Sequence, residues 1–195
     1  MSVLDQQFIK LNLGCGANKK DGFENVDQYG DPDRVWDLEQ CPWPWASDSV
    51  KEVWMEHVLE HVGQDPKVFG QMIQELYRVC VDGARVTVIV PHPRHDNFLN
   101  DPTHVRAITP NTLDMLSKAK NRYWQEQGAS NTPLALYWDV DFELVSVHQE
   151  LDKFWRERLE RGEIDQKEVI KAQRRFNNVI IETHMELKVI KDERV

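Results

Sequence analysis

The sequence HVLEH at residues 57–61 has two histidines and a glutamate at a spacing that zinc-dependent hydrolases use, H-x-x-E-H. Residues four apart share one face of a helix, so two imidazoles there can bind one metal ion. Gly63 and Pro66 follow within two turns, which leaves no sustained helix to hold His57 and His61 in place. The sequence therefore predicts that His57 lines a pocket and that His61 packs or faces solvent, with a zinc metallohydrolase as the remote alternative.

Further histidines follow residue 91. His92, His95 and Asp96, together with His104, form a conceivable metal set. The spacing of His92 and His95 is loose for a structural site, and no cysteine stands near them in sequence. We predict no metal site, and binding of a divalent ion by these histidines stays open.

His104 and Arg106 are the strongest catalytic candidates in this part of the chain. A neutral imidazole accepts a proton near pH 7, and a guanidinium pairs with an anionic group. We predict that His104 acts as a base or orients a substrate, with Arg106 holding a negative charge on that substrate. In the alternative, His104 only shapes its loop by hydrogen bonding.

The first half of the chain alternates strands with a helix. Short apolar or alternating runs predict strands at residues 8–13, 23–26, 49–55 and 84–90. Apolar residues at helical spacing predict a helix over 66–80, ended by residues 81–83, which include Gly83. This order indicates an α/β fold with a parallel sheet.

The second half begins with a polar segment at residues 92–136 that contains several prolines and reads as an irregular substrate loop. Alternating runs at 141–148 and 179–190 predict two strands that pair antiparallel at one edge of the sheet. Between them, residues 151–176 read as two helices broken near Gly162. The whole chain, 1–195, is expected to form one domain.

Two glycines and an acid stand at the ends of the first two predicted strands. Gly14 and Gly16 let the backbone approach a ligand closely, and Asp27 can accept hydrogen bonds from both hydroxyls of a ribose. Ligands of open α/β sheets bind outside the carboxyl ends of the strands, where Glu56 and Pro91 also project. The pattern predicts a nucleoside-bearing cofactor.

Four motifs in order, LNLGCG, NVD, WDL and CPWPWASDSVKEVWMEHVLEHV, resemble the class I S-adenosylmethionine-dependent methyltransferases across residues 9–92. The resemblance implies a Rossmann-like fold, S-adenosylmethionine as cofactor and S-adenosylhomocysteine as product. It implies a glycine loop under the methionine part, an acid on the ribose, an acid and a leucine at the adenine, and two residues near the methionine end. The cofactor-binding residues implied are Asn12, Gly14, Cys15, Gly16, Asp27, Asp37, Leu38, Glu56 and His57.

The chain departs from the family pattern in three places. Asn12 stands where many members have an acid, and Asn18 replaces the third glycine of the loop. Residues 17–24 are too few for a crossover helix, so a turn or loop must join the first two strands. The shortened form is similar to a subgroup of small predicted methyltransferases, and the D-P-x-H-x-R stretch at 101–106 extends that similarity.

The predicted function is methyl transfer from S-adenosylmethionine to an oxygen or nitrogen of a small-molecule or carbohydrate-like acceptor. The alternative is a protein with this fold that binds the cofactor or a partner without turnover. Nucleic acid is not an expected partner, because the net charge is −9 and the N/D-P-P-Y/F string of DNA amino-methyltransferases is replaced by residues 56–59.

The composition predicts a cytoplasmic protein. Its three cysteines are odd in number and widely spaced, as in reduced thiols, and no apolar run reaches membrane-spanning length. The start of the sequence lacks the pattern of a secretory signal. A homodimer contact, or a cover over the pocket, is left open for residues 151–176.

Overall fold

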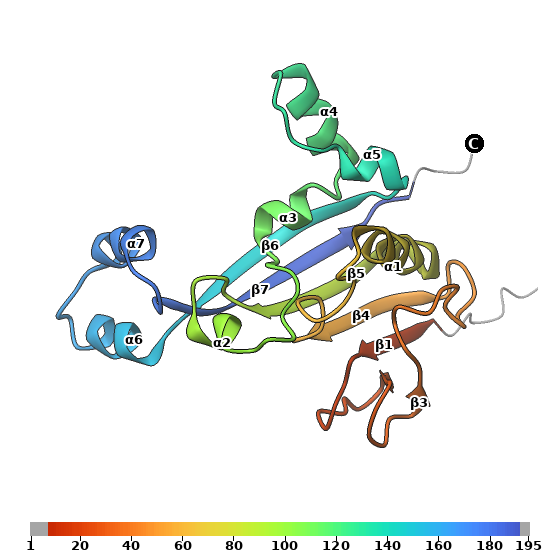
Figure 1. Ribbon diagram of the computed structural model, residues 1–195, viewed down its shortest axis with the longest axis horizontal. Helices are drawn as coiled ribbons and strands as arrows, with labels where there is room; N and C mark the ends of the chain where they lie inside the picture. The colour runs from red at the N-terminus through yellow and green to blue at the C-terminus, as the bar shows by residue number, and fades with distance from the viewer. Residues whose placement is uncertain (1–7, 192–195) are drawn as a thin grey trace, which may run out of the picture.

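The computed structural model describes residues 8–191, so both ends of the predicted domain 1–195 lie outside the described residues. Its centre is a seven-stranded sheet in the order β3-β2-β1-β4-β5-β7-β6 (Figure 1). Strands β1 to β5 pair in parallel, whereas β7 runs antiparallel to both β5 and β6. The strands are β1 Ile9–Leu13, β2 Glu24–Asp27, β3 Arg34–Val35, β4 Val50–Glu56, β5 Cys80–Pro91, β6 Phe142–Leu151 and β7 Ile180–Val189. A mostly parallel sheet with an antiparallel edge is the predicted fold class, which is confirmed.

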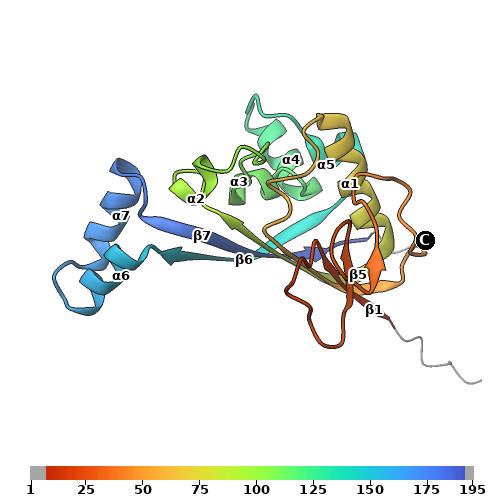
Figure 2. The ribbon, with the colours of Figure 1, turned by 60° about the horizontal axis from the view of Figure 1, so that its bottom comes forward.

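The helices are distributed unevenly around this sheet. Helices α1 to α5 lie over one face, while α6 and α7 stand at the far end of the β6–β7 hairpin (Figure 2). They are α1 Pro66–Val79, α2 Asp96–Leu99, α3 Pro110–Asp114, α4 Lys118–Glu126, α5 Leu134–Trp138, α6 Lys153–Glu160 and α7 Gln166–Arg175. None of the helices within residues 8–191 is long and apolar enough to cross a membrane.

The core lies between α1 and the covered face of the sheet. Helix α1 begins where the Asp65 side chain accepts a hydrogen bond from the backbone N–H of Lys67 and Pro66 occupies the first turn. Its apolar face then packs on alternate side chains of four strands, at about 1.5–3 kcal/mol for each fully buried side chain. The buried residues of this contact include Phe69, Met72, Ile73 and Leu76 from α1 and Leu11, Leu13, Val53, Met55, Val86, Val88, Met185 and Leu187 from the sheet.

The opposite face of the sheet carries charged and polar side chains. Lys10 of β1 pairs with Glu52 of β4 at 2.6 Å, and Arg85 of β5 lies 3.4 Å from a carboxylate of β7. The predicted short first crossover is confirmed, since residues 14–23 contain no helix. The loop lays the ammonium of Lys20 on the ring of Trp54, 3.8 Å from its centroid. The loop thus covers part of the face that a crossover helix would occupy.

The predicted helix end at residues 81–83 is wrong. Helix α1 ends at Val79, and Cys80 is already extended and begins β5. Gly83, at φ +73°, lies within β5, where the pairing with β4 shifts register. The glycine therefore serves a β-bulge, which also needs a residue that tolerates positive φ.

The segment 92–136 is more regular than its sequence indicates, because it contains α2, α3 and α4 and the start of α5. The segment 151–176 contains two helices, as expected: α6 ends before Gly162, and α7 begins directly after its N-cap Asp165, which forms a capping box with Glu168.

Candidate functional site

The carboxyl ends of β1 and β2 are hydrogen-bonded to each other. The chain leaves β1 through Gly14 and Gly16, which have φ +66° and +50°. The backbone N–H of Gly16 donates to Oδ2 of Asp27 at 2.8 Å, and that of Cys15 donates to the carbonyl of Val26 at 3.0 Å. The glycine turn and the acid therefore lie side by side, as a nucleoside site at the strand ends requires.

Two adjoining hollows open at this place, and they share Gly14 and His57. The first is lined by Gly14, Asp27, Gln28, Trp36, Asp37, Leu38, His57, Val58, His61 and Val62. The second is lined by Asn12, Gly14, Cys15, Gly16, Ala17, Asn18, Glu56 and His57. All nine residues predicted to bind the cofactor line one hollow or the other. A wider hollow beside α1 lies at the opposite ends of the strands and holds none of them.

The glycine loop leaves room for a ligand on one side and none on the other. A Cβ added at Gly16 would meet no atom within 4 Å, whereas one at Gly14 would come 2.4 Å from Cγ2 of Val58. Gly14 is thus required for the close approach of the loop to the segment after β4, and Gly16 presents bare backbone to the hollow.

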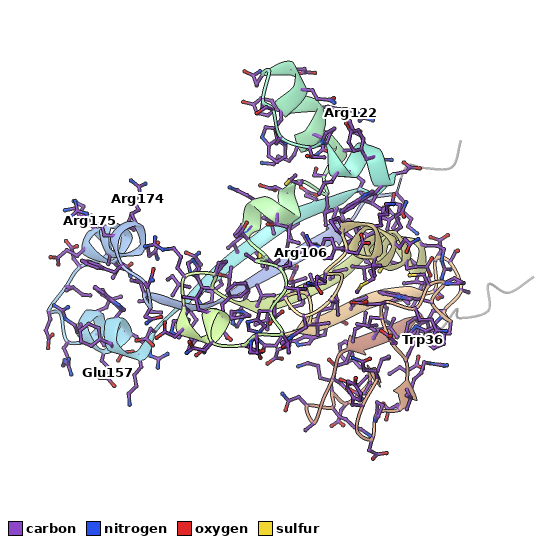
Figure 3. The ribbon with its side chains drawn as sticks, viewed as in Figure 1. Trp36, Arg106, Arg122, Glu157, Arg174 and Arg175 are labelled. Atoms are coloured by element: carbon purple, nitrogen blue, oxygen red, sulfur yellow. The ribbon has the colours of Figure 1, made fainter. Side chains whose placement is uncertain are left out.

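Trp36 is a wall residue for which the sequence predicted no role, although the WDL motif contains it. The indole is half-buried, and its Nε1–H is buried with no hydrogen-bond partner in the described part of the chain. Figure 3 shows Trp36 at the β1–β3 side of the molecule. A buried donor without a partner is costly, so this indole is suited to donate to a polar ligand in the first hollow.

Asn12 organises the loop that replaces the crossover helix. Its amide group is buried and donates to the carbonyl of Asn18 and to Oδ1 of Asn25, both at 2.9 Å. The same Oδ1 accepts from the backbone N–H of Lys20 at 2.7 Å. An ionised acid at position 12 has no proton to donate, so the departure from the family pattern follows from the shortened connection.

His57 stands at the meeting point of the two hollows in a left-handed conformation, φ +54°, which is rare for residues other than glycine. Its Nδ1 donates to Oε1 of Glu60 at 3.3 Å, and its Nε2 lies 3.5 Å from Oε2 of Glu182. The hydrogen bond to Glu60 raises the pKa of His57 above its ordinary value against the effect of burial, and the charges of Glu60, Glu182 and Glu56 act in the same direction. The imidazole is 45% exposed, so it is accessible from the cleft.

The other two predicted catalytic residues do not line either hollow. His104 is only 7% exposed, and its Nδ1 donates to the carbonyl of Phe98 at 2.8 Å. The guanidinium of Arg106 lies over the ring of Phe69 and donates to the carbonyl of Gly63, and burial lowers its pKa. Arg106 is half-buried and lies near the middle of the view in Figure 3.

The metal sets considered from the sequence are not assembled. Residues 57–61 contain no helix, so His57 and His61 do not share a helical face as the H-x-x-E-H site requires. His92 accepts from the backbone N–H of Arg94, and His95 caps α2. Among the described residues, the groups close enough to hold a metal include neither His92 nor His95.

The strand order and the site together define a Rossmann-like methyltransferase fold. No family model and no curated protein matches the chain. Among solved structures, it is similar to a SAM-dependent methyltransferase from Archaeoglobus fulgidus at 17% identity and TM-score 0.59, covering 94% of this chain and 87% of that one. A SAM-dependent methyltransferase from Methanosarcina mazei matches at 13% identity and TM-score 0.55, covering 97% and 95%. The cyclase SpnF matches at 13% identity and TM-score 0.54, covering 98% and 78%. At these identities the likeness shows the fold, and the chemistry must be argued from the site.

Proposed function

We propose that this protein binds S-adenosylmethionine in the paired hollows and transfers its methyl group to an oxygen or nitrogen of a small-molecule or carbohydrate-like acceptor. One observation carries the proposal: all nine residues that the sequence assigned to the cofactor line two hollows that meet at Gly14 and His57. Two methyltransferases of the same fold support it.

The residues present fit this cofactor. Asp27 offers a carboxylate to the ribose hydroxyls at the carboxyl end of β2, and the bare backbone of Gly16 leaves space for the methionine part. Asp37 and Leu38 form the polar and apolar contacts of an adenine, beside the unpartnered Nε1–H of Trp36. The bound cofactor supplies an electrophilic methyl group on a sulfonium.

The acceptor is proposed to bind against His57. Methyl transfer to oxygen or nitrogen needs a nucleophile aligned with the methyl group, and a side chain facing the cleft can hold the acceptor in that position. Of the three predicted catalytic residues, His57 alone lines the hollows, and Glu60 and Glu182 fix its two ring nitrogens. The proposal therefore assigns the acceptor contact to His57 in place of His104.

Calorimetric titration with S-adenosylmethionine and S-adenosylhomocysteine tests the proposal. We expect one molecule of either compound to bind per chain. Failure of both to bind would remove the proposed function. The second assay measures release of S-adenosylhomocysteine from S-adenosylmethionine in the presence of pooled hydroxyl- and amine-bearing small molecules. Binding of both compounds without this release would support the non-catalytic alternative. The assay is needed because a cyclase has a similar fold.

The variant His57→Asn is expected to lower turnover about 100-fold, because it removes the side chain that orients the acceptor. Asparagine tolerates the left-handed backbone found at this position, so the cleft should keep its shape. The measurement compares S-adenosylhomocysteine release and its binding constant in the two proteins. Unchanged turnover would exclude His57 from the acceptor site, and S-adenosylhomocysteine affinity within threefold of the parent, to about 0.6 kcal/mol, would show an intact cofactor site.

The cytoplasmic location, the single domain over 1–195 and a homodimer contact through α6 and α7 stay predictions. Figure 3 shows Arg174 and Arg175 projecting outward from α7, away from the sheet. Analytical ultracentrifugation of the full chain tests the dimer.

A further inference from the structure

The loop after β4 and the loop after β5 are hydrogen-bonded to each other beside the proposed cofactor cleft. The backbone N–H groups of Val105 and Arg106 both donate to the carbonyl of Glu60, at 2.8 and 3.3 Å. This contact places the segment after β4 against the D-P-x-H-x-R stretch after β5. Side chains from both segments therefore meet, and three of them carry metal-binding atoms.

Glu60, His61 and His104 each offer one ligand atom, and these atoms all lie within 4.8 Å of one another. The carboxylate of Glu60 is 1% exposed. One of its oxygens, Oε1, accepts from His57, but Oε2 is buried with no hydrogen-bond partner anywhere in residues 8–191. A buried carboxylate oxygen without a partner is strongly destabilising, so its position calls for a cation.

The proton of His104 is fixed by its surroundings. Its Nδ1 lies 2.8 Å from the carbonyl of Phe98, which can only accept. Nδ1 therefore carries the hydrogen, and in the neutral ring Nε2 keeps its lone pair. A backbone carbonyl on the far nitrogen is the usual support of a metal-binding histidine.

The proton of His61 is fixed through one more residue. The hydroxyl of Thr103 lies 2.6 Å from Oδ1 of Asp101 and 2.9 Å from Nδ1 of His61. The carboxylate can only accept, so the hydroxyl donates to Asp101 and its oxygen accepts from Nδ1–H of His61. The lone pair of His61 is then also on Nε2.

We propose that Glu60, His61 and His104 bind a zinc ion through one carboxylate oxygen and two Nε2 atoms. Two imidazoles and a carboxylate are a ligand set of zinc, and three protein ligands leave one position open to water or substrate. The ion would tie the loop after β4 to the loop after β5 at the edge of the first hollow, which His61 also lines. The site differs from the H-x-x-E-H arrangement, because His57 supports the carboxylate and is not a ligand.

A second group of possible metal ligands in the described residues serves as a comparison for the proposed zinc site. Glu150, Glu182 and His184 also lie within 4.8 Å of one another, but all three are only partly buried. Nε2 of His184 is already engaged by Oε1 of Glu182 at 2.6 Å, so this group lacks the unpartnered buried oxygen that distinguishes Glu60.

Metal titration of the full chain, stripped with a chelator and without S-adenosylmethionine, tests the site. We expect one equivalent of zinc to bind, and cobalt to bind in its place with the visible absorption of a tetrahedral site. Zinc at about 100 times its dissociation constant should raise the Tm by about 5–10 °C. His61→Ala and His104→Ala should each lower zinc affinity at least about 100-fold, whereas His184→Ala should leave it unchanged.

The variant Thr103→Val tests the site without removing a ligand, in case the ligand variants fail to fold. It removes the acceptor that orients His61 and leaves all three ligands, and should weaken zinc binding about 10- to 100-fold with the Tm of the metal-free protein nearly unchanged. Absence of a stoichiometric zinc site, or loss of binding in His184→Ala alone, would overturn the proposal. Neither result bears on the binding of S-adenosylmethionine, which is measured separately.

Discussion

Asp27→Ala is expected to weaken the binding of S-adenosylmethionine and S-adenosylhomocysteine about 10- to 150-fold, or about 1.5 to 3 kcal/mol, because it removes a charge-assisted contact to the ribose. The same carboxylate accepts from the backbone N–H groups of Gly16 and Tyr29, so the change also loosens the glycine loop. Calorimetric titration of both ligands measures the effect.

Two further variants distinguish loss of the ribose contact from loss of the hydrogen bonds by which Asp27 supports the glycine loop. Asp27→Asn keeps an oxygen that can accept a backbone hydrogen bond but removes the charge, so it should weaken ligand binding while leaving the Tm close to that of the parent. Asp31→Ala removes an exposed carboxylate from the same region and should bind as the parent does. Equal affinity in Asp27→Ala and the parent would place the ribose elsewhere.

Gly63→Ala is expected to lower the free energy of unfolding by about 3 kcal/mol or more. Gly63 has φ +66°, and a Cβ added there would lie 2.6 Å from Cβ and 2.7 Å from Cα of Phe69. The Cα belongs to the backbone of α1, so the clash can be relieved only by shifting the helix on the sheet. Backbone strain and overpacking each contribute about 1–3 kcal/mol. Urea unfolding of the two proteins measures the loss.

Gly162→Ala is the matched control for this prediction. Gly162 has nearly the same φ, +70°, and a Cβ there would meet nothing within 4 Å. It should therefore show only the backbone part of the loss, about 1 kcal/mol. Equal losses in the two alanine variants would mean that the contact with Phe69 has no energetic weight.

The parts of the site that follow from local chemistry could be read from the sequence. A strand that ends in a glycine turn and a strand that ends in an acid must place both at the same sheet edge when the strands are parallel, and the glycine turn and Asp27 do lie side by side. The short first crossover was also predictable, since residue count alone excludes a helix there.

Helix α4 shows why other parts were missed. Its sequence is polar throughout, and its one buried residue is Asn121, which donates to the carbonyl of Met115 and accepts from the backbone N–H of Ala135. A helix anchored by an amide has no apolar periodicity to detect. The place of His104 outside the hollows could not be predicted either, because only the fold shows that the carbonyl of Phe98 holds its Nδ1.

The place of β7 in the sheet bears on how the chain reaches its native state. β7 is hydrogen-bonded between β5 and β6, although both precede it in the sequence, β5 by about a hundred residues. During synthesis from the amino end, β6 has no neighbour in the sheet until β7 has left the ribosome. The parallel half can assemble early, and the late insertion of β7 between β5 and β6 completes the sheet.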